Sequence, residues 1–377
     1  MPYWRLSGFY FFYFAPIGVL LPYWGLYLQS IGFDAVAIGQ LMALLMVSRT
    51  VAPIVWGWVA DRREWRMQVV RLTSLLTCLS FVGIYVGTDY AWIALVMLAF
   101  SFFWNAALPL LDVMTMNQLG HRPGAYGRVR LWGSIGFIVA VLVVGTLIDL
   151  QGPGWVPPAL LVIMIAIWLS SLGLPDTAVR ATANTPKSLR HALLRPEVAT
   201  FLFACFLIHV SHGPYNTFYS IYLADHGYAK TVIGQLWAIG VVCEIGIFLV
   251  MQQLLRRFAL RTVLLASALL AALRWLLIGF FPEDLAVLIF AQALHAASFG
   301  AFHAVGIQFV HRFFTGRHQH TGQAIYGSAS FGLGGVIGSL YSGYAWETLG
   351  PVMTFGIAAV AALGAFAIAL VGLKPKS

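Results

Sequence analysis

Long apolar segments separated by short polar loops make up almost all of this 377-residue sequence. Each segment has about 20 residues or more, the length that a helix needs to cross a hydrocarbon layer about 30 Å thick. Lipid offers no partner for backbone polar groups, so such segments predict helices, and the alternating pattern of β-barrel strands is absent. The pattern predicts an all-α polytopic membrane protein with twelve transmembrane helices, at about 7–29, 36–60, 67–87, 91–118, 127–148, 156–174, 198–223, 231–254, 261–280, 284–312, 321–344 and 350–373.

An internal repeat divides these segments into two halves. Residues 26–44 read LYLQSIGFDAVAIGQLMAL, and residues 221–239 read IYLADHGYAKTVIGQLWAI. Each copy leaves one apolar segment through Tyr-Leu and enters the next through Ile-Gly-Gln-Leu, and the same offset aligns Arg49 with Glu244. Secondary transporters are often built from such repeats, with the substrate site near the middle of the membrane. The repeat therefore favours a transporter made of two related halves.

The composition agrees with a membrane location. Hydrophobic residues make up 60% of the chain and charged residues 9%, whereas soluble domains carry about 25% charged residues. The longest polar stretch, 175–197, is basic, and we expect it to be a cytoplasmic linker between two six-helix bundles, 1–174 and 198–377. All three cysteines fall within apolar segments, so neither a disulfide nor a metal site is expected.

Basic residues are distributed unevenly around the apolar segments. If the N-terminus is internal, Lys230 is the one basic residue on the external side, and Arg49 and Arg274 lie within apolar segments. The other Lys and Arg residues then fall on the internal side, as the positive-inside rule requires. This asymmetry predicts a bacterial inner-membrane protein with both termini in the cytoplasm. Orientation also explains the net charge of +9, so no nucleic-acid partner is expected.

The loop after the second apolar segment contains a motif. Residues 57–66 read GWVADRREWR. This stretch resembles the loop signature of the major facilitator superfamily, although Glu64 replaces the second glycine of that signature. The resemblance implies a conformational latch between neighbouring helix ends, made of Gly57, Asp61, Arg62 and Arg66. The alternative is a solvated loop whose arginines only set the topology.

Ionisable side chains within the apolar segments are the candidate functional residues. Glu244 has no polar neighbour within a helical turn, so it either takes a proton or pairs with a cation. Arg49 and Arg274 cannot lose their charge, so each needs Asp112, Glu244 or a bound substrate as an anionic partner. The alternatives are a tolerated core carboxyl group and an Arg274 that reaches the interface. With Arg130, three cations face two carboxylates, and this excess favours an anionic substrate.

Histidines and aromatic residues gather in the seventh and tenth segments. His295 and His303 are eight residues apart and therefore close to one helical face, where they would suit a proton relay. Hydrogen-bonded core histidines are the alternative. The stretch HVSHGPYNTFYSIYL, which contains His212 and Tyr215, is expected to line a cavity, because lipid would reject its polar groups. No nucleophile–base pair is visible, so neither an enzyme nor a cofactor is expected.

Two stretches resemble lactose permease and its oligosaccharide/proton relatives. They are NAALPLLD at 105–112 and YGRVRLWGSIGF at 126–137. The resemblance implies substrate-binding roles for an amide, an acid, an arginine and an aromatic residue, namely Asn105, Asp112, Arg130 and Phe137. An acid and an arginine near adjoining helix ends can pair, so a purely structural ion pair is the alternative.

Taken whole, the chain resembles the phenylpropionate permease group of the major facilitator superfamily. The matching stretches are YGRVRLWGS, GVVCEIGIF, LRWLLIG and QALHAASFGAFH. Lactose permease has an acid where this chain has Ser298, so its proton mechanism does not transfer directly. The expected substrate-binding residues are Arg49, Asn105, Asp112, Arg130, Phe137, His212, Tyr215 and Arg274, and the expected proton-coupling residues are Asp112, Glu244, His295 and His303.

These observations lead to one functional expectation. We expect a monomeric, proton-coupled symporter that moves an aromatic monocarboxylate, such as a phenylpropionate-like acid, by alternating access. Its partners would be the small-molecule substrate, protons and the lipid bilayer. A sugar or nucleoside symporter and a proton-driven efflux pump are the alternatives within transport. A membrane sensor is the alternative outside transport.

Overall fold

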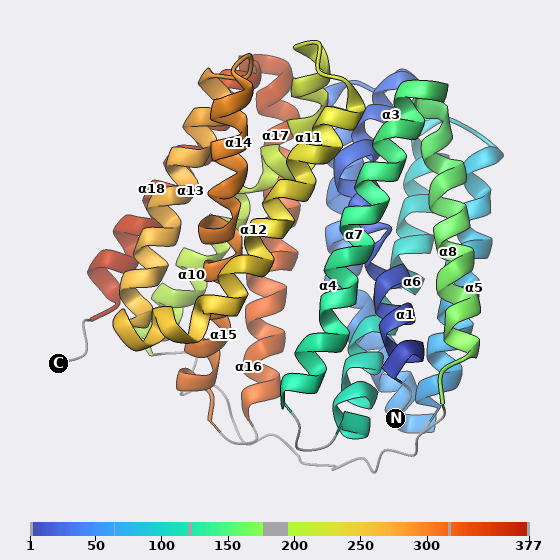
Figure 1. The fold of residues 1–377 in the computed structure, drawn as a ribbon, viewed down its shortest axis with the longest axis horizontal. Helices are drawn as coiled ribbons and strands as arrows, with labels where there is room; N and C mark the ends of the chain where they lie inside the picture. Colours follow the sequence, from blue (N-terminus) through green and yellow to red (C-terminus); the bar gives the residue numbers. More distant parts are fainter. Residues whose placement is uncertain (1–2, 64, 120–122, 176–194, 316–317, 375–377) are drawn as a thin grey trace. The chain divides into compact units, whose positions relative to one another are not determined.

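Helices account for nearly all of the described chain (Figure 1). The computed structural model describes residues 3–63, 65–119, 123–175, 195–315 and 318–374. No β-strand occurs in these ranges, so the all-α prediction is confirmed. Most of the predicted linker 175–197 lies outside the described residues. The chain divides into two units, described separately below: Met1–Thr182 with Ala229–Gln235, and Ala183–Tyr228 with Leu236–Ser377.

The first unit contains six stretches that are long and apolar enough to cross a membrane, counted over its described residues. Each begins and ends close to a predicted segment. Their helices are α1 (Tyr3–Phe14), α2 (Ile17–Val19), η1 (Leu20–Trp24), α3 (Gly25–Ser30), α4 (Ala35–Arg63), α5 (Arg66–Val82), η2 (Gly83–Tyr85), α6 (Tyr90–Leu119), α7 (Pro123–Gln151), η3 (Pro153–Trp155) and α8 (Val156–Leu172).

The first of these stretches is an interrupted helix. Pro16 follows the end of α1, and η1 has the wider π-helical turn around Pro22. A proline has no N–H group and clashes with the preceding turn, so the regular hydrogen-bond pattern cannot continue through it. Tyr23, next to this proline, donates a hydrogen bond from its hydroxyl to the backbone oxygen of Val141 at 2.7 Å. The break is thus stabilised by a contact with α7.

Close packing between the first stretch and α7 requires glycine. A Cβ atom at Gly136 would lie 2.0 Å from the backbone oxygen of Phe11, and one at Gly18 would lie 2.5 Å from that of Phe137. Both distances are far below van der Waals contact, so a larger residue would push the helices apart. Small residues play this role at many membrane helix interfaces. The contact holds Arg130 and Phe137 of α7 beside α1 and α2.

The second unit contains five further stretches that are long and apolar enough to span a membrane, counted over its described residues. Three consecutive helical pieces, α16, η6 and α17, form a further helical stretch. The predicted segment 321–344 falls inside this further stretch. The helices are α10 (Pro196–Ser211), α11 (Gly213–Asp225), α12 (Lys230–Arg257), α13 (Leu260–Phe280), α14 (Leu285–Ala293), η4 (Ala296–Ala301), α15 (Phe302–Phe313), α16 (Gln319–Tyr326), η6 (Gly327–Gly334), α17 (Gly335–Leu349) and α18 (Pro351–Gly372).

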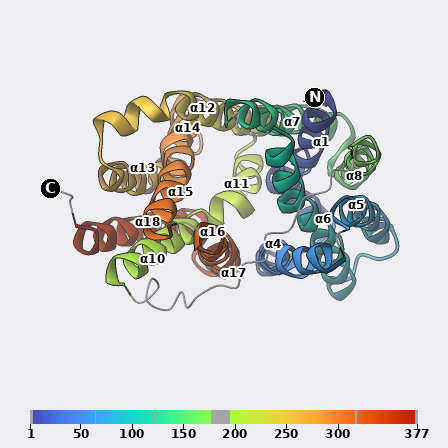
Figure 2. The same cartoon turned by 90° about the horizontal axis from the view of Figure 1, so that it is seen from below.

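An alanine-rich face packs α18 against α13, and the two helices run side by side in Figures 1 and 2. Spacings of three and four residues place these alanines on one side of α18. Their small side chains allow the two backbones to approach closely. The buried members of this face are Ala358, Ala362, Ala365 and Ala369. This packing fixes the position of α13, which carries Arg274.

Candidate functional site

Arg274 lies at the centre of a polar cluster in the second unit. Its side chain is 0% exposed. It precedes the end of α13 at Phe280 by six residues, which is about 9 Å along the axis at 1.5 Å per residue. Three side chains from the following part of the chain accept hydrogen bonds from its guanidinium. Arg274 is therefore held inside the unit and does not reach the interface.

The hydrogen bonds of Arg274 determine the tautomer of its histidine neighbour. Its Nη1 atom donates to His295 Nδ1 at 3.0 Å and to Ser298 Oγ at 3.4 Å, and its Nη2 atom donates to Gln292 Oε1 at 3.2 Å. A guanidinium has donors only, so His295 Nδ1 must accept. The neutral imidazole then carries its proton on Nε2.

His295 links Arg274 to Glu244. The Nε2 atom of His295 lies 3.4 Å from Oε2 of Glu244, which is near the middle of α12. The N–H group of the imidazole thus faces the carboxylate, while its other nitrogen accepts from the guanidinium. Glu244 thus supplies the negative charge that balances Arg274, and the neutral imidazole of His295 lies between the two. The hydrogen bond from Arg274 to His295 and the close His295–Glu244 contact connect the three side chains in a largely buried setting, where polar interactions are strong.

Aromatic rings cover the guanidinium of Arg274. Its Cζ atom lies 4.0 Å from the ring centroid of Tyr215 and 4.7 Å from that of Trp275. Tyr215 packs on Trp237 with a centroid separation of 4.4 Å, and its hydroxyl donates to Gln292 Oε1 at 3.0 Å. Ring faces attract cations and also stack on aromatic ligands. The cluster therefore combines a fixed cation with stacking surfaces.

His212 brings an unpaired acceptor to this cluster. It follows α10, and its ring lies 4.9 Å from that of Trp275. Its Nδ1 atom donates to the backbone oxygen of Ile208 at 2.7 Å, so Nε2 carries the lone pair. That Nε2 atom is buried and has no hydrogen-bond partner among the described residues. Buried polar atoms are nearly always paired, so this one indicates a position for a polar ligand group.

A π-helical turn shapes the tenth membrane stretch at the cluster. It spans Ala296–Ala301 and so begins directly after His295. Such turns are frequent at functional sites. The ring of Phe299 stacks on His295 at 5.1 Å and on His303 at 6.3 Å, with interplanar angles of 6° and 10°. The prediction that the two histidines share a face is confirmed, with Phe299 between them, whereas a proton-relay role for His303 stays a prediction.

The first unit holds Asp112 in a different environment. Asp112 is half-buried on α6, and one of its carboxylate oxygens accepts hydrogen bonds from the hydroxyls of Tyr10 and Tyr126, the latter at 3.0 Å. Tyr10 also approaches Thr115 Oγ1 at 3.4 Å. In the described part of the chain, no ion pair joins Asp112 to Arg130. Arg130 nevertheless acts on Asp112 electrostatically, so a pairing of these two residues stays a prediction.

Arg130 contacts an aromatic ring. Its Cζ atom lies 3.7 Å from the ring centroid of Phe14 on α1. Asn105 donates to the backbone oxygen of Ser101 at 2.8 Å, within its own helix. Phe137 is buried, at 8% exposure. The structure thus places these predicted residues in one unit but does not gather them into one hydrogen-bonded cluster.

Arg49 occupies the midpoint of α4, which spans Ala35–Arg63. Its side chain is exposed, although it stands at the depth where a spanning helix would meet hydrocarbon. A charged group in contact with lipid at that depth is costly, so exposure there indicates a polar path. Glu244 occupies the equivalent midpoint of α12. The repeat predicted that Arg49 and Glu244 occupy equivalent positions, and the structure confirms this, since each lies at the midpoint of its helix.

The loop motif is folded around an ion pair at the end of α4. Arg66 Nη2 lies 2.8 Å from Asp61 Oδ1, and Asp61 remains 61% exposed. The guanidinium of Arg62 lies 5.3 Å from the ring centroid of Trp58. Exposed ion pairs contribute about 0–1 kcal/mol, so this pair does little for stability. The latch role of Gly57, Asp61, Arg62 and Arg66 stays a prediction.

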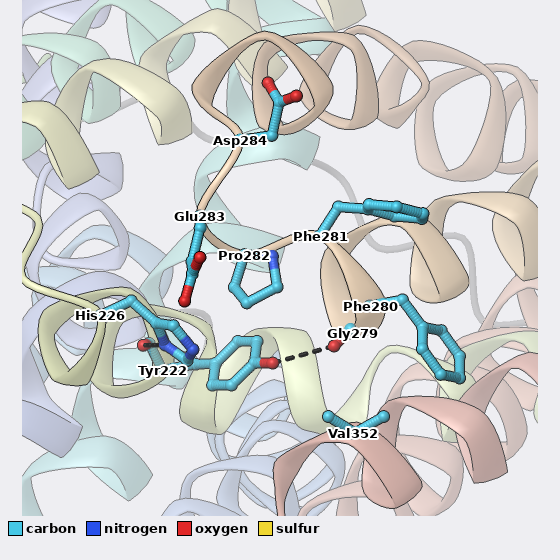
Figure 3. A pocket seen from close by; sticks show the side chains of 9 residues that line it. All are labelled: Tyr222, His226, Gly279, Phe280, Phe281, Pro282, Glu283, Asp284 and Val352. Carbon is cyan, nitrogen blue, oxygen red and sulfur yellow. Dashed lines mark hydrogen bonds between the residues drawn. The ribbon is translucent and has the colours of Figure 1, made fainter.

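A pocket of about 490 Å³ opens where α13 ends, and none of the predicted site residues line it (Figure 3). The Tyr222 hydroxyl donates to the backbone oxygen of Gly279 at 2.9 Å across its floor. The side chains of His226 and Glu283 lie beside that tyrosine. Asp284, at its rim, accepts from the backbone N–H groups of Ala286 and Val287 and so begins α14. The pocket is built mainly from helix ends.

Sequence reasoning missed several residues of both clusters. Gln292 stands one turn before His295 in an otherwise apolar helix, and that position is a signal that could have identified it. Trp275 directly follows Arg274 in the sequence. Tyr10 and Tyr126 resemble ordinary interfacial aromatic residues, and only the folded chain brings them to Asp112. No group of three or more metal-ligating side chains was found in the described ranges.

Comparisons with known proteins give the same architecture. The chain is 30% identical to the "Probable 3-phenylpropionic acid transporter" of Escherichia coli (strain K12), over 99% of this chain and 97% of that protein. It is 28% identical to the maltose permease of Geobacillus stearothermophilus, over 92% of this chain and 89% of the permease. The crystal structure of the nucleoside transporter NupG superposes with a TM-score of 0.84 at 20% identity, with complete coverage of both chains.

The family assignment rests on nearly the whole sequence. Residues 3–357 match the family described as the MFS_1 like family. The relatives and the structural neighbour are transporters, which agrees with the absence of a nucleophile–base pair in the sequence. This is a multi-pass membrane transporter and not an enzyme: the chain belongs to the MFS_1 like family of the major facilitator superfamily.

Proposed function

We propose that the chain imports an aromatic monocarboxylate together with a proton by alternating access. The observation that carries this proposal is Arg274, a fully buried cation covered by aromatic rings and hydrogen-bonded only to uncharged acceptors among the described residues. The relative named as a 3-phenylpropionic acid transporter supports the same substrate class. A carboxylate and an aromatic ring are the two groups that such a site would recognise.

The carboxylate would bind to the guanidinium. Arg274 donates to His295, Ser298 and Gln292, all of them neutral acceptors in this arrangement. A carboxylate that replaces one or two of them forms shorter, charge-assisted bonds and can use the planar fork of arginine in a bidentate way. The ring of the substrate would stack on Tyr215 and Trp237, and each well-placed ring pair contributes about 0.5–1.5 kcal/mol.

Proton uptake would be coupled to substrate binding through His295. A second proton on this imidazole must go to Nδ1, which is the atom that accepts from Arg274. Protonation and the Arg274–His295 bond therefore exclude each other, because both partners would then be donors. The imidazolium would pair with Glu244, and a guanidinium N–H would become available for the substrate. Tyr215 and His212 are the other titratable side chains that face this group.

Charge balance supports one proton per carboxylate. In the described arrangement, the charges of Arg274 and Glu244 cancel within the cluster. An anionic substrate adds one negative charge, and protonated His295 adds one positive charge. The loaded cluster is again neutral, which avoids burying an uncompensated charge. Transport would then be electroneutral.

Proteoliposomes test this proposal directly. External 3-phenylpropionate should enter wild-type vesicles and acidify the lumen, with no response to an imposed membrane potential. Its uncharged amide should not compete. Arg274→Gln should lose binding of the acid, whereas Arg257→Gln, an exposed change of equal charge at the end of α12, should behave as wild type. Equal competition by acid and amide in the wild type would contradict the proposal.

A nucleoside or sugar is the second candidate substrate. The unpaired Nε2 atom of His212 favours it, because a hydroxyl group could donate to that acceptor. Competition by uridine or maltose, with no effect of 3-phenylpropionate, would select this alternative. Proton-driven efflux would be selected instead if vesicles with an acidic lumen accumulated 3-phenylpropionate against its gradient, because an antiporter exchanges outgoing protons for incoming substrate.

Orientation belongs to the same proposal. We infer an inner-membrane monomer with both termini in the cytoplasm, which the asymmetry of basic residues supports. A cysteine introduced at Lys187 should be labelled from the cytoplasmic side, and one at Asp89 from the other side. Labelling of both positions from one side would reject this map. The loop around Asp61 and Arg66 would then lie in the cytoplasm, where it would act as a latch.

A further inference from the structure

A second pocket, of about 330 Å³, lies where five helices of the second unit end or begin. It is bounded by the first turns of α10 and α13 and by the last turns of α12, α15 and α18, which are grouped in the view of Figure 2. None of the predicted site residues contributes to it. Its lining residues include Glu197, Leu255, Phe258, Arg261, Phe309, Arg312, Phe313, Leu373 and Lys374.

The charges of this pocket are unbalanced. Arg261, Arg312 and Lys374 line it, and Glu197 is its one acidic lining residue. Glu197 is exposed and so is well solvated. The described part of the chain contains no ion pair between Glu197 and any of these cations. The pocket therefore presents an excess of positive charge, which is complementary to an anion.

Arg261 is held in place by the protein. Its Nη2 atom donates to the backbone oxygen of Leu370 at 2.6 Å, near the end of α18. Its Nε atom is buried and makes no hydrogen bond within the described residues. The residue also stands in the first turn of α13, whose N-cap, Ala259, offers no side-chain acceptor. The free N–H groups of that turn and the guanidinium face the same pocket, and both favour an anionic oxygen.

The other walls of the pocket are apolar. Leu255, Phe309, Phe313 and Leu373 contribute to them, and Phe258 is 50% exposed beside the cations. A free phosphate ion gains nothing from such walls, whereas a lipid has its phosphate directly attached to apolar chains. The ends of spanning helices also lie at the depth of lipid headgroups. Basic pockets at this depth are known to bind anionic headgroups.

We propose that this pocket binds the headgroup phosphate of an anionic phospholipid. The phosphate lies against Arg261, Arg312 and the first turn of α13. The acyl chains leave along Phe258 and Leu255. Lys374 adds long-range attraction from the end of the described chain. The bound lipid would link the ends of α13, α15 and α18, in addition to the Arg261–Leu370 hydrogen bond.

Native mass spectrometry of the purified full chain tests this site. Phosphatidylglycerol and phosphatidylethanolamine with identical acyl chains are added separately, and inorganic phosphate is added as the headgroup-only probe. We expect phosphatidylglycerol to bind at least about tenfold more tightly than phosphatidylethanolamine. The variants Arg261→Gln and Arg312→Gln should each weaken the binding of phosphatidylglycerol by about tenfold, which is the effect expected from one lost charge-assisted contact.

Arg256→Gln is the matched control, because it removes one exposed charge near the end of α12 without lining the pocket. It should leave phosphatidylglycerol binding unchanged. If Arg261→Gln does not fold, Arg312→Gln and Lys374→Gln carry the test. Equal binding of the two lipids, or equal losses in Arg256→Gln and Arg312→Gln, overturns the proposal. Competition by millimolar inorganic phosphate with no preference between lipids also overturns it, in favour of a free phosphate site.

Discussion

The two units stabilise their buried charged side chains in different ways. In the second unit, a hydrogen bond joins Arg274 to His295 and a 3.4 Å contact joins His295 to Glu244, so the state of one depends on the other two. In the first unit, Asp112 accepts from neutral tyrosine hydroxyls, and Arg130 lies on the ring of Phe14. Those two charges interact electrostatically, but no direct ion pair joins them among the described residues. When charged groups are in direct contact, protonation of one changes the contacts of the others. Groups without such contact can bind a substrate or stabilise the fold but do not pass this change on.

Neutralising the arginine of each unit should give the largest contrast. Arg274→Gln leaves Glu244 without its balancing cation, and breaking such a buried arrangement costs about 3–5 kcal/mol. Arg130→Gln loses one cation–ring contact, worth about 0.5–2 kcal/mol. Thermal unfolding in one detergent should therefore show a clearly larger loss for Arg274→Gln. Equal losses would mean that the two units stabilise their cations in the same way.

Glu244→Gln should separate accumulation from exchange. The amide keeps the shape of the carboxylate but cannot balance an imidazolium at His295, so the coupled proton should no longer be taken up. We expect a folded protein that loses uphill accumulation and retains exchange of labelled for unlabelled substrate. Counterflow in proteoliposomes measures exchange, and uptake driven by an imposed pH gradient measures accumulation. Undiminished uphill transport would remove Glu244 from the coupling mechanism and direct attention to His295 and Asp112.

Asp112→Asn should have a smaller effect on coupling. An asparagine oxygen can still accept from Tyr10 and Tyr126, so the local hydrogen bonds survive the loss of charge. Uphill accumulation should persist, at a reduced rate. Uptake driven by the same imposed pH gradient provides the comparison with Glu244→Gln. Complete loss of accumulation in Asp112→Asn would show that the first unit also carries the coupled proton.

Tyr126→Phe should have the smallest effect of the series. It removes one hydrogen bond to Asp112 while Tyr10 continues to donate, so the expected destabilisation is about 1 kcal/mol. Transport should stay within about twofold of wild type. Thermal unfolding and initial uptake rates measure the two quantities. A loss as large as that of Arg130→Gln would mean that the tyrosines do more than satisfy the carboxylate.

Most of the fold could be predicted from the sequence, because a lipid bilayer requires helices of a certain length and apolar composition. Segment length and apolar composition predicted the spanning helices, and the repeat predicted the equivalent midpoints of Arg49 and Glu244. The interruptions were not predicted. Pro22 signals one of them, but the π turn after His295 contains no proline and arises from packing.

The candidate site could be predicted from the sequence only in part. Charges in apolar helices are conspicuous, so Arg274, Glu244 and His295 could be selected from sequence alone. The order in which they contact one another could not be predicted, because it depends on contacts between three separate helices. The hydrogen bonds that Asp112 accepts could not be predicted for a related reason. Tyrosine hydroxyls compete for carboxylates, and sequence does not show which tyrosines come near.

The burial of Arg274 also has a consequence for the way the chain enters the membrane. An arginine at the centre of a helix raises the free energy of membrane insertion by about 2.5–3.5 kcal/mol. Gln292 and His295 follow 18 and 21 residues later in the chain and so emerge from the ribosome after Arg274. Tyr215 and Glu244 are made earlier and are available when α13 arrives. Partners on α11 and α12 therefore lower the cost of inserting α13, and retention of those helices near the insertion machinery would favour its insertion.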